Sequence, residues 1–245
     1  MTDRGTINRE RPMYDEQNPY APGAVWESDV ATRATFIRRT YLHLLAAIVA
    51  FVGIEAALFQ SGAAATIAHA MLGTSWLLVL GAFMLVSWLA SKAAFSALSL
   101  PAQYAALAVY VVAEALVFVP LIWIAARIAP DVIGSAALLT ALGFTGLTVI
   151  AFVTRQDFSF LRGLLMWGGV CALLLIVGGA IFGFQLGLWF SIGMVAFAGA
   201  AILYDTSNVL HHFPEDRYVG AAMELFASVA LLFWYVLRLM MSLRK

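Results

Sequence analysis

From Tyr41 onwards the chain alternates between long apolar runs and short polar breaks. A helix needs about 17–25 residues to cross the roughly 30 Å hydrocarbon core of a bilayer, and seven runs meet that length. No run shows the alternating pattern typical of a membrane β-barrel, so we predict helices, which satisfy their backbone groups internally. The predicted spans are 41–60, 75–95, 104–128, 132–153, 163–184, 186–210 and 218–241.

Composition supports an all-α, polytopic membrane protein. Hydrophobic residues make up 63% of the 245 residues and charged residues 11%, whereas an ordinary soluble domain is about 25% charged. The formal net charge of +0 gives no electrostatic basis for binding nucleic acid. The single cysteine, Cys171, excludes an internal disulfide and a cysteine-based metal site.

The first forty residues differ from the rest, because twelve charged side chains stand there. We predict that residues 1–40 form a polar, flexible tail and that residues 41–245 form the transmembrane domain. The tail lacks the pattern of a secretory signal, which runs from a short basic region straight into an apolar stretch. We therefore expect a multi-pass protein of a bacterial inner membrane.

Basic residues near the spans predict the orientation, because cytoplasmic loops carry an excess of Lys and Arg. Seven fall on the side of the N-terminus and four on the opposite side, which places the N-terminus and the tail in the cytoplasm. The seven are Arg33, Arg38, Arg39, Lys92, Arg155, Arg162 and Arg217, and the four are Arg127, Arg238, Arg244 and Lys245.

Four acidic residues fall within the predicted spans: Glu55, Glu114, Asp205 and Glu224. A charged side chain costs about 2.5–3.5 kcal/mol or more at the bilayer centre, so such residues usually face a partner or a water-filled cavity. No basic residue is predicted at comparable depth. These acids are therefore the candidate functional residues.

Asp205 and Glu224 form the most suggestive pair. Each stands six residues from the polar loop between the last two spans, which places both roughly 9 Å inside it at 1.5 Å per residue. Ser228 lies one turn beyond Glu224 on the same face. Two carboxylates at one level cannot both ionise cheaply, and a shared proton or a bound cation relieves their repulsion. In the alternative reading, Asp205 caps the sixth span together with residues 206–208, and Glu224 is merely solvated.

Two roles remain open for Glu114, near the middle of the third span: part of a pore or proton path, or a hydrogen bond to a neighbouring helix. Glu55 is expected at the membrane interface. We interpret His211 and His212 as a loop pair rather than a metal site, since a metal usually needs a third ligand. They could make the cytoplasmic mouth sensitive to pH.

Three motifs stand in the second half of the chain: the acidic stretch Ile202–Leu210 and then, after a short loop, Ala221–Phe226 and Leu232–Leu239. Together they resemble the Bax inhibitor-1 (transmembrane Bax inhibitor motif) family. A fourth segment, Thr154–Arg162, resembles the bacterial branch of that family. The resemblance covers residues 41–241 and is strongest after residue 145.

This resemblance implies a seven-helix bundle with the last helix central, wrapped by the other six. It also implies an ion leak, usually for calcium, that opens or closes with pH. In that family an aspartate of the sixth span pairs with one of the seventh to form a proton-sensitive latch. Asp205 matches the first aspartate, Ser228 stands in place of the second, and Glu224 lies one turn earlier, where several members carry another acid.

We therefore predict a pH-sensitive cation leak channel, with calcium as the cation, and no enzymatic activity. Asp205, Glu224, Ser228 and Glu114 are the predicted ion pathway, and Asp205 with Glu224 a weak calcium site, because calcium prefers six to eight oxygen ligands. No catalytic residue and no cofactor beyond transient calcium is expected. The predicted partners are the lipid bilayer and calcium or protons. The alternative function is a regulator that binds a membrane protease or another membrane complex without transport of its own.

Overall fold

The computed structural model describes residues 25–96 and 99–244, and every regular element within these ranges is helical. Seven of the α-helices are long and apolar enough to cross a membrane. The predicted all-α fold with seven spans is therefore confirmed. The elements are η1 (Val25–Glu27), α1 (Val30–Gln60), α2 (Ala63–Leu72), α3 (Trp76–Ser96), α4 (Leu100–Ile128), α5 (Pro130–Thr154), α6 (Leu161–Phe182), α7 (Leu188–His211) and α8 (Tyr218–Leu243).

The largest difference from the predicted spans lies at the start of α1, which begins at Val30 rather than near Tyr41. The side chain of Asp29 accepts a hydrogen bond from the backbone N–H of Thr32 at 2.8 Å, and such an N-cap satisfies a donor that the helix itself cannot. Residues 30–40 of the predicted tail are therefore helical. Residues 1–24 lie outside the described residues, so the flexibility of the tail stays a prediction.

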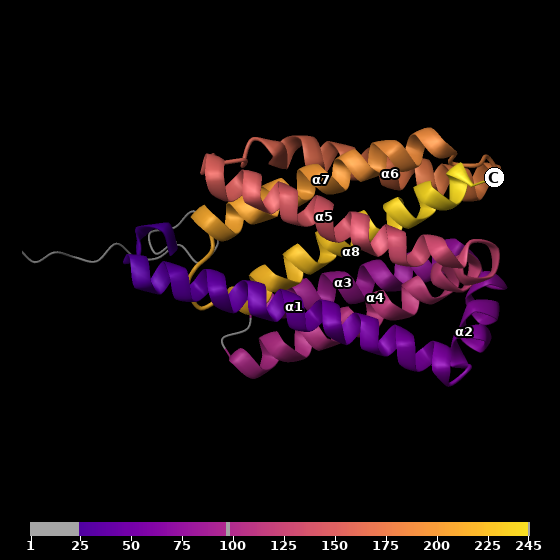
Figure 1. Ribbon diagram of the computed structural model, residues 1–245, viewed down its shortest axis with the longest axis horizontal. Coiled ribbons are helices and arrows are strands. Elements are labelled where there is room, and N and C mark those ends of the chain that lie inside the picture. Colours follow the sequence, from indigo (N-terminus) through magenta and orange to yellow (C-terminus); the bar gives the residue numbers. More distant parts are fainter. Residues whose placement is uncertain (1–24, 97–98, 245) are drawn as a thin grey trace, which may run out of the picture.

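The short helix α2 is not among the predicted elements, because ten residues are too few to cross a bilayer. Gly62, whose φ of 78° favours glycine, turns the chain between α1 and α2. Ala64 and Ala68 of α2 then pack against Val119 of α4. Thus α2 folds over the far end of the bundle, the end at which α1 finishes (Figure 1).

The remaining connections follow the predicted order. The α5–α6 loop (155–160) and the α7–α8 loop (212–217) lie at the N-terminal end of the bundle, where α1 begins. The predicted tight turn between the fifth and sixth spans is confirmed, since only residues 183–187 separate α6 from α7. Gly183 ends α6 with a φ of 76°, the left-handed conformation common after a helix C-terminus.

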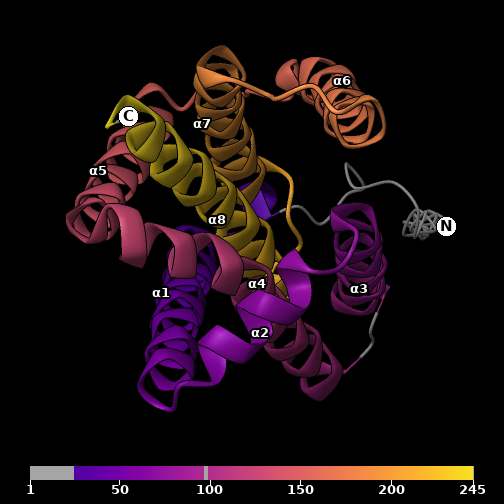
Figure 2. The ribbon, with the colours of Figure 1, turned by 90° about the vertical axis from the view of Figure 1, so that its right-hand side faces the viewer.

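Helix α8 runs through the middle of the bundle, and α1, α3, α4, α5 and α7 all pack against it (Figure 2). Its first turns carry Gly220, Ala221 and Ala222, all buried. Small residues let neighbouring helices approach closely, which matters in lipid because no hydrophobic effect drives helices together there. The central position of the last helix is confirmed.

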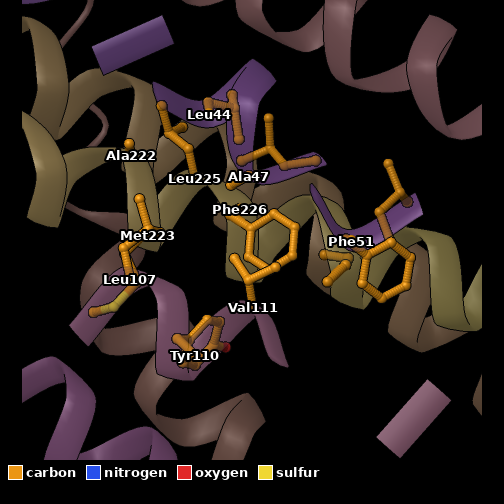
Figure 3. Close-up of a cluster of buried hydrophobic side chains, with 14 of the residues drawn as sticks. Leu44, Ala47, Phe51, Leu107, Tyr110, Val111, Ala222, Met223, Leu225 and Phe226 are labelled. Atoms are coloured by element: carbon orange, nitrogen blue, oxygen red, sulfur yellow. The ribbon is translucent and has the colours of Figure 1, made fainter. Parts of the chain in front are cut away.

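An aromatic core joins α1, α4 and α8 (Figure 3). The ring of Phe51 meets Phe118 edge-on at a centroid distance of 5.1 Å and Phe226 at 6.1 Å, and Tyr110 meets Phe226 at 6.1 Å. Edge-to-face contacts at these distances are favourable for aromatic rings. This core holds the three helices in a fixed register beside the acidic residues.

Helix α6 is the exception to the predicted wrapping. It packs mainly against α7, and Ala172 is its only residue that is buried. Figure 2 shows it standing apart from α8. The expectation that all six other spans surround the last helix is therefore wrong for α6, because a cavity lies between α6 and α8.

Candidate functional site

The site is built around a direct contact between α7 and α8. Asp205 lies inside α7, which continues to His211, and it is buried. The hydroxyl group of Ser228 on α8 donates a hydrogen bond to Oδ2 of Asp205 at 2.5 Å. The alternative reading of Asp205 as a helix cap is therefore excluded, because its carboxyl group reaches across to the next helix.

Glu224 stands one turn before Ser228 on α8 and is half-buried. It interacts electrostatically with Asp205, so the predicted proximity of these two acids is found in the structure. The direct hydrogen bond to Asp205 comes from Ser228, and the predicted equal depth of Asp205 and Glu224 stays a prediction.

Helix α4 adds two further groups. The hydroxyl group of Tyr110 donates to Oε1 of Glu114 at 3.0 Å, and both residues are buried. Tyr110 also interacts electrostatically with Asp205. The structure therefore brings all four predicted site residues into one group with Tyr110, here called the carboxylate cluster: Tyr110, Glu114, Asp205, Glu224 and Ser228.

Sequence reasoning missed Tyr110, although a signal for it exists. A residue four positions before Glu114 lies on the same face of a helix, and a tyrosine there can donate to the carboxylate. Glu114 thus has its hydrogen bond within its own helix, not with a neighbouring one.

Glu55 lies outside the carboxylate cluster. It is 7% exposed, and neither carboxylate oxygen has a hydrogen-bond partner among the described residues. Glu55 is therefore buried within the protein, and its expected position at the membrane interface stays a prediction.

A large cavity reaches the carboxylate cluster from the far end of the bundle. Its volume is about 1250 Å³, and α3, α4, α6, α7 and α8 line it. Tyr110, Glu114 and Ser228 belong to its wall, as does Arg238 near the end of α8. Asp205 and Glu224 do not belong to this wall, and Ser228 links it to Asp205 through its hydrogen bond.

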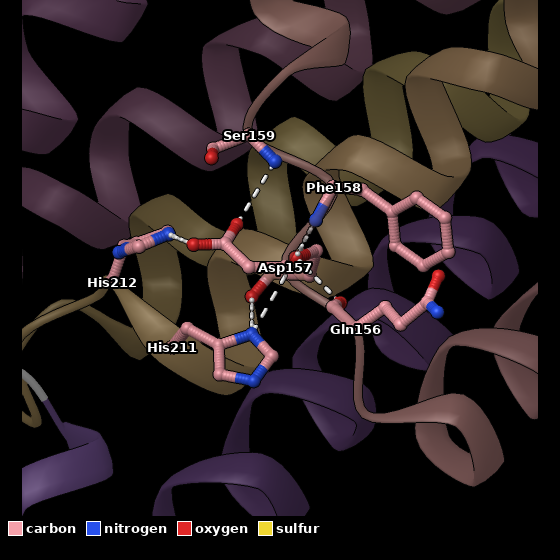
Figure 4. A network of polar contacts seen from close by, with 7 residues as sticks. Gln156, Asp157, Phe158, Ser159, His211 and His212 are labelled. Atoms are coloured by element: carbon pink, nitrogen blue, oxygen red, sulfur yellow. Dashed lines mark hydrogen bonds and ion pairs between the residues drawn. The ribbon is translucent and has the colours of Figure 1, made fainter.

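At the N-terminal end, a polar network ties the α5–α6 loop to the end of α7 (Figure 4). Ser207, two residues beyond Asp205, accepts a hydrogen bond from the N–H of Phe158 at 2.9 Å. Asp157 forms an ion pair with His212 at 3.1 Å and accepts from the N–H of Ser159. Burial raises the pKa of Asp157, but the hydrogen bonds from Ser159 and His212 outweigh it and hold that pKa below its ordinary value.

Comparison of the sequence with known proteins identifies the family of this chain. The sequence profile of the family described as inhibitor of apoptosis-promoting Bax1 matches residues 33–245. The chain belongs to the Bax inhibitor-1 family.

Several curated relatives are bacterial. A 112-residue segment is 38% identical to an uncharacterised protein of Pseudomonas aeruginosa, covering 44% of this chain and 49% of that protein. A 100-residue segment is 36% identical to YccA, named as the modulator of the FtsH protease in Escherichia coli K12, covering 40% and 45%. The same protein in a second Escherichia coli strain is named an inner membrane protein. The matches span about half the length of these relatives.

Within this Bax inhibitor-1 protein, the carboxylate cluster offers oxygen atoms from carboxylate, hydroxyl and phenol groups. No group of three or more His, Cys, Asp or Glu side chains arranged to hold a metal ion occurs among residues 25–96 and 99–244. Such a set of oxygens suits weak and transient contact with a hard cation better than tight binding, because calcium takes six to eight oxygen ligands.

Proposed function

We propose that this membrane protein is a pH-gated cation leak, with calcium as the transported ion and the carboxylate cluster as the gate. The observation that supports it is a set of three acidic side chains from α4, α7 and α8 that meet inside membrane-spanning helices. Burying such groups in the hydrocarbon region is costly, and residues of this kind commonly mark ion and proton pathways.

The gate works through the repulsion between Asp205 and Glu224. When both carboxyl groups are ionised in a setting poor in water, their repulsion is relieved by a proton or by a cation. With a proton present, the hydrogen bond from Ser228 keeps α7 against α8 and the route stays closed. When the proton leaves, the pair attracts a cation and the contact between the two helices loosens.

The cavity supplies one half of the route. It leads from the far end to Ser228 and Glu114, and Asp205 with Glu224 separates it from the N-terminal end. We place that end in the cytoplasm, because most basic residues near the spans lie on that side. The host membrane is then the bacterial inner membrane, as the name of the Escherichia coli relative indicates for that protein.

Calcium flux into liposomes that contain the purified protein and a calcium-sensitive dye tests this proposal. We expect the flux of the parent protein to change across a pH series and that of Asp205→Asn to be flat. Glu224→Gln should shift the midpoint, because it removes one of the two repelling charges. Glu215→Gln, which removes an exposed carboxylate of the α7–α8 loop, is the matched control and should behave as the parent does. An Asp205→Asn protein that responds to pH like the parent contradicts the gate.

A second function, regulation of a membrane protease, is supported by the printed name of the Escherichia coli relative. We propose the membrane protease FtsH as the partner to test, and residues 1–24 as the arm that contacts it. Deleting these residues leaves α1 and its Asp29 cap in place. Loss of co-purification with the protease, together with unchanged calcium flux, favours separate roles for the tail and the bundle. Unchanged co-purification contradicts the assignment of the tail.

A further inference from the structure

The cavity between α6 and α8 has the form of a lateral groove. Its wall is mostly apolar and includes Phe83 on α3, Leu173 on α6 and Leu231 on α8. Two of its residues, Met84 on α3 and Met166 on α6, are 46% and 66% exposed. The groove therefore opens sideways between α3 and α6, the direction in which a membrane-spanning helix meets lipid.

One cation stands at the far end of the groove. Arg238 is half-buried, and its guanidinium donates to the carbonyl of Leu186 at 3.0 Å. The ion pairs formed among the described residues do not include it. A guanidinium carries five N–H donors, so donors remain for an anionic group. A guanidinium matches the geometry of a phosphate and can bind two of its oxygens at once.

The part of the groove between Arg238 and Ser228 is about as long as one leaflet of a bilayer. Ten residues of α8 separate these two lining residues, a rise of roughly 15 Å. This is half of the roughly 30 Å hydrocarbon core. Arg238 and the apolar groove beside it therefore match the two parts of a single phospholipid. The guanidinium suits its phosphate group, and the groove suits an acyl chain that extends through one leaflet.

We infer that the lateral groove binds one anionic diacyl phospholipid, with its phosphate on Arg238 and an acyl chain that runs along α6 and α8 to Ser228. The acyl chain fills space in the groove. Without it the groove walls would lack contacts, since the atoms around an unfilled gap lose their dispersion attraction. The phosphate neutralises a cation that would otherwise lie unpaired at the membrane surface. This inference does not rest on ion conduction, because lipid binding is measured whether or not the protein conducts. The bound lipid belongs to the closed state, since its acyl chain occupies the cavity that the proposed ion route uses when open.

Native mass spectrometry of the purified full-length protein tests the headgroup. Phosphatidylglycerol is titrated against phosphatidylcholine of the same chain length. We expect one tightly held phosphatidylglycerol, and about fivefold or greater weakening in Arg238→Gln, the effect of removing one basic residue near a membrane surface. Arg244→Gln is the matched control, because Arg244 lies at the same helix end but pairs with Asp131 and has no place in the groove wall. It should bind as the parent does.

The acyl chain is tested separately by filling the groove. Ile176→Trp places a larger side chain on the groove wall, and Leu174→Trp places the same side chain on the exposed face of the same helix. We expect the first to release the lipid and the second to retain it. Equal binding by Arg238→Gln, Ile176→Trp and the parent overturns the inference, as do equal affinities for the two lipids or a dimer that excludes lipid. If Arg238→Gln fails to fold, the two tryptophan variants decide.

Discussion

Helices α6 and α8 are both apolar and long enough to span a bilayer, yet they occupy opposite positions. By mean hydropathy α6 is the more apolar, but only Ala172 is buried in it, whereas fifteen residues of α8 are buried. In water the more apolar helix would be expected at the centre. In lipid the rule differs, because lipid tails are as apolar as leucine and packing is driven by shape and by polar contacts. Helix α8 carries Glu224 and Ser228, whose polar interactions with Asp205 of α7 favour a position inside the bundle.

The largest expected difference between the packed centre and α6 is the loss of stability when an aromatic ring is removed. Phe118→Ala should lower the free energy of unfolding by roughly 3 kcal/mol, because Phe118 is 2% exposed and contacts Phe51, Phe233 and Trp234. Phe182→Ala, on α6 where the ring is 80% exposed, should change it by less than about 0.5 kcal/mol. Denaturant titration in detergent micelles measures both. Similar losses would contradict the distinction between a packed and a lipid-facing helix.

The close approach of α6 to α7 at Gly168 should be the next most sensitive. A Cβ atom at Gly168 would lie 2.9 Å from the ring of Phe197, whereas one at Gly163 on the same helix meets nothing within 4 Å. Gly168→Ala should therefore destabilise by about 1–2 kcal/mol through overpacking. Gly163→Ala should be neutral or stabilise by up to about 1 kcal/mol, since alanine favours the helix. Thermal unfolding compares the two, and a neutral Gly168→Ala would mean that α6 is free to move away from α7.

Removing a polar contact inside the bundle should lower the stability by a smaller amount. Ser228→Ala removes the hydrogen bond to Asp205 and should cost about 1 kcal/mol. Ser191→Ala is the matched control, because this buried serine on α7 has an Oγ without a hydrogen-bond partner in the described part of the chain. It should leave stability nearly unchanged. Equal effects in denaturant titration would show that the Ser228–Asp205 bond does not hold the two helices together.

The smallest effect is expected at the surface. Because the folded-state pKa of Asp157 lies below its ordinary value, its stabilising contribution is present above about pH 4 and is lost as the pH falls through the lowered value. Asp157→Asn should cost less than about 1 kcal/mol near pH 7, since the pair with His212 is partly exposed. Thermal unfolding in a series from about pH 7 down to about pH 2 should show that the difference between parent and variant shrinks as Asp157 becomes protonated. A difference that persists in acid would contradict the role of the ionised group.

The spans could be predicted closely because a transmembrane helix satisfies its own backbone, so length and composition within one segment decide it. The short connection between the fifth and sixth spans followed from the same local rule, although it begins at Gly183, inside the predicted span 163–184. Helix α2 could not be predicted this way, since its ten residues are held by packing on Val119 rather than by crossing the bilayer. The start of α1 at Asp29 depends on a single cap, which lies in a stretch that composition assigns to the tail.

The carboxylate cluster shows the same division. Intramembrane acids are rare enough that Glu114, Asp205 and Glu224 were predictable from position alone, and the resemblance placed Ser228 beside Asp205. Tyr110 was not predicted, although its i, i+4 spacing to Glu114 was visible in the sequence. That Glu55 is buried could not be predicted, because burial depends on residues far away in the chain.

Local chemistry along the chain was enough to specify seven membrane helices, their order and the acids they carry. Three-dimensional packing decided which of these helices lies at the centre, which acid bonds to which neighbour and where a groove remains. The physical reason is that each span forms its own hydrogen bonds regardless of its neighbours. The contacts between spans depend on shape, and shape depends on residues far apart in the chain.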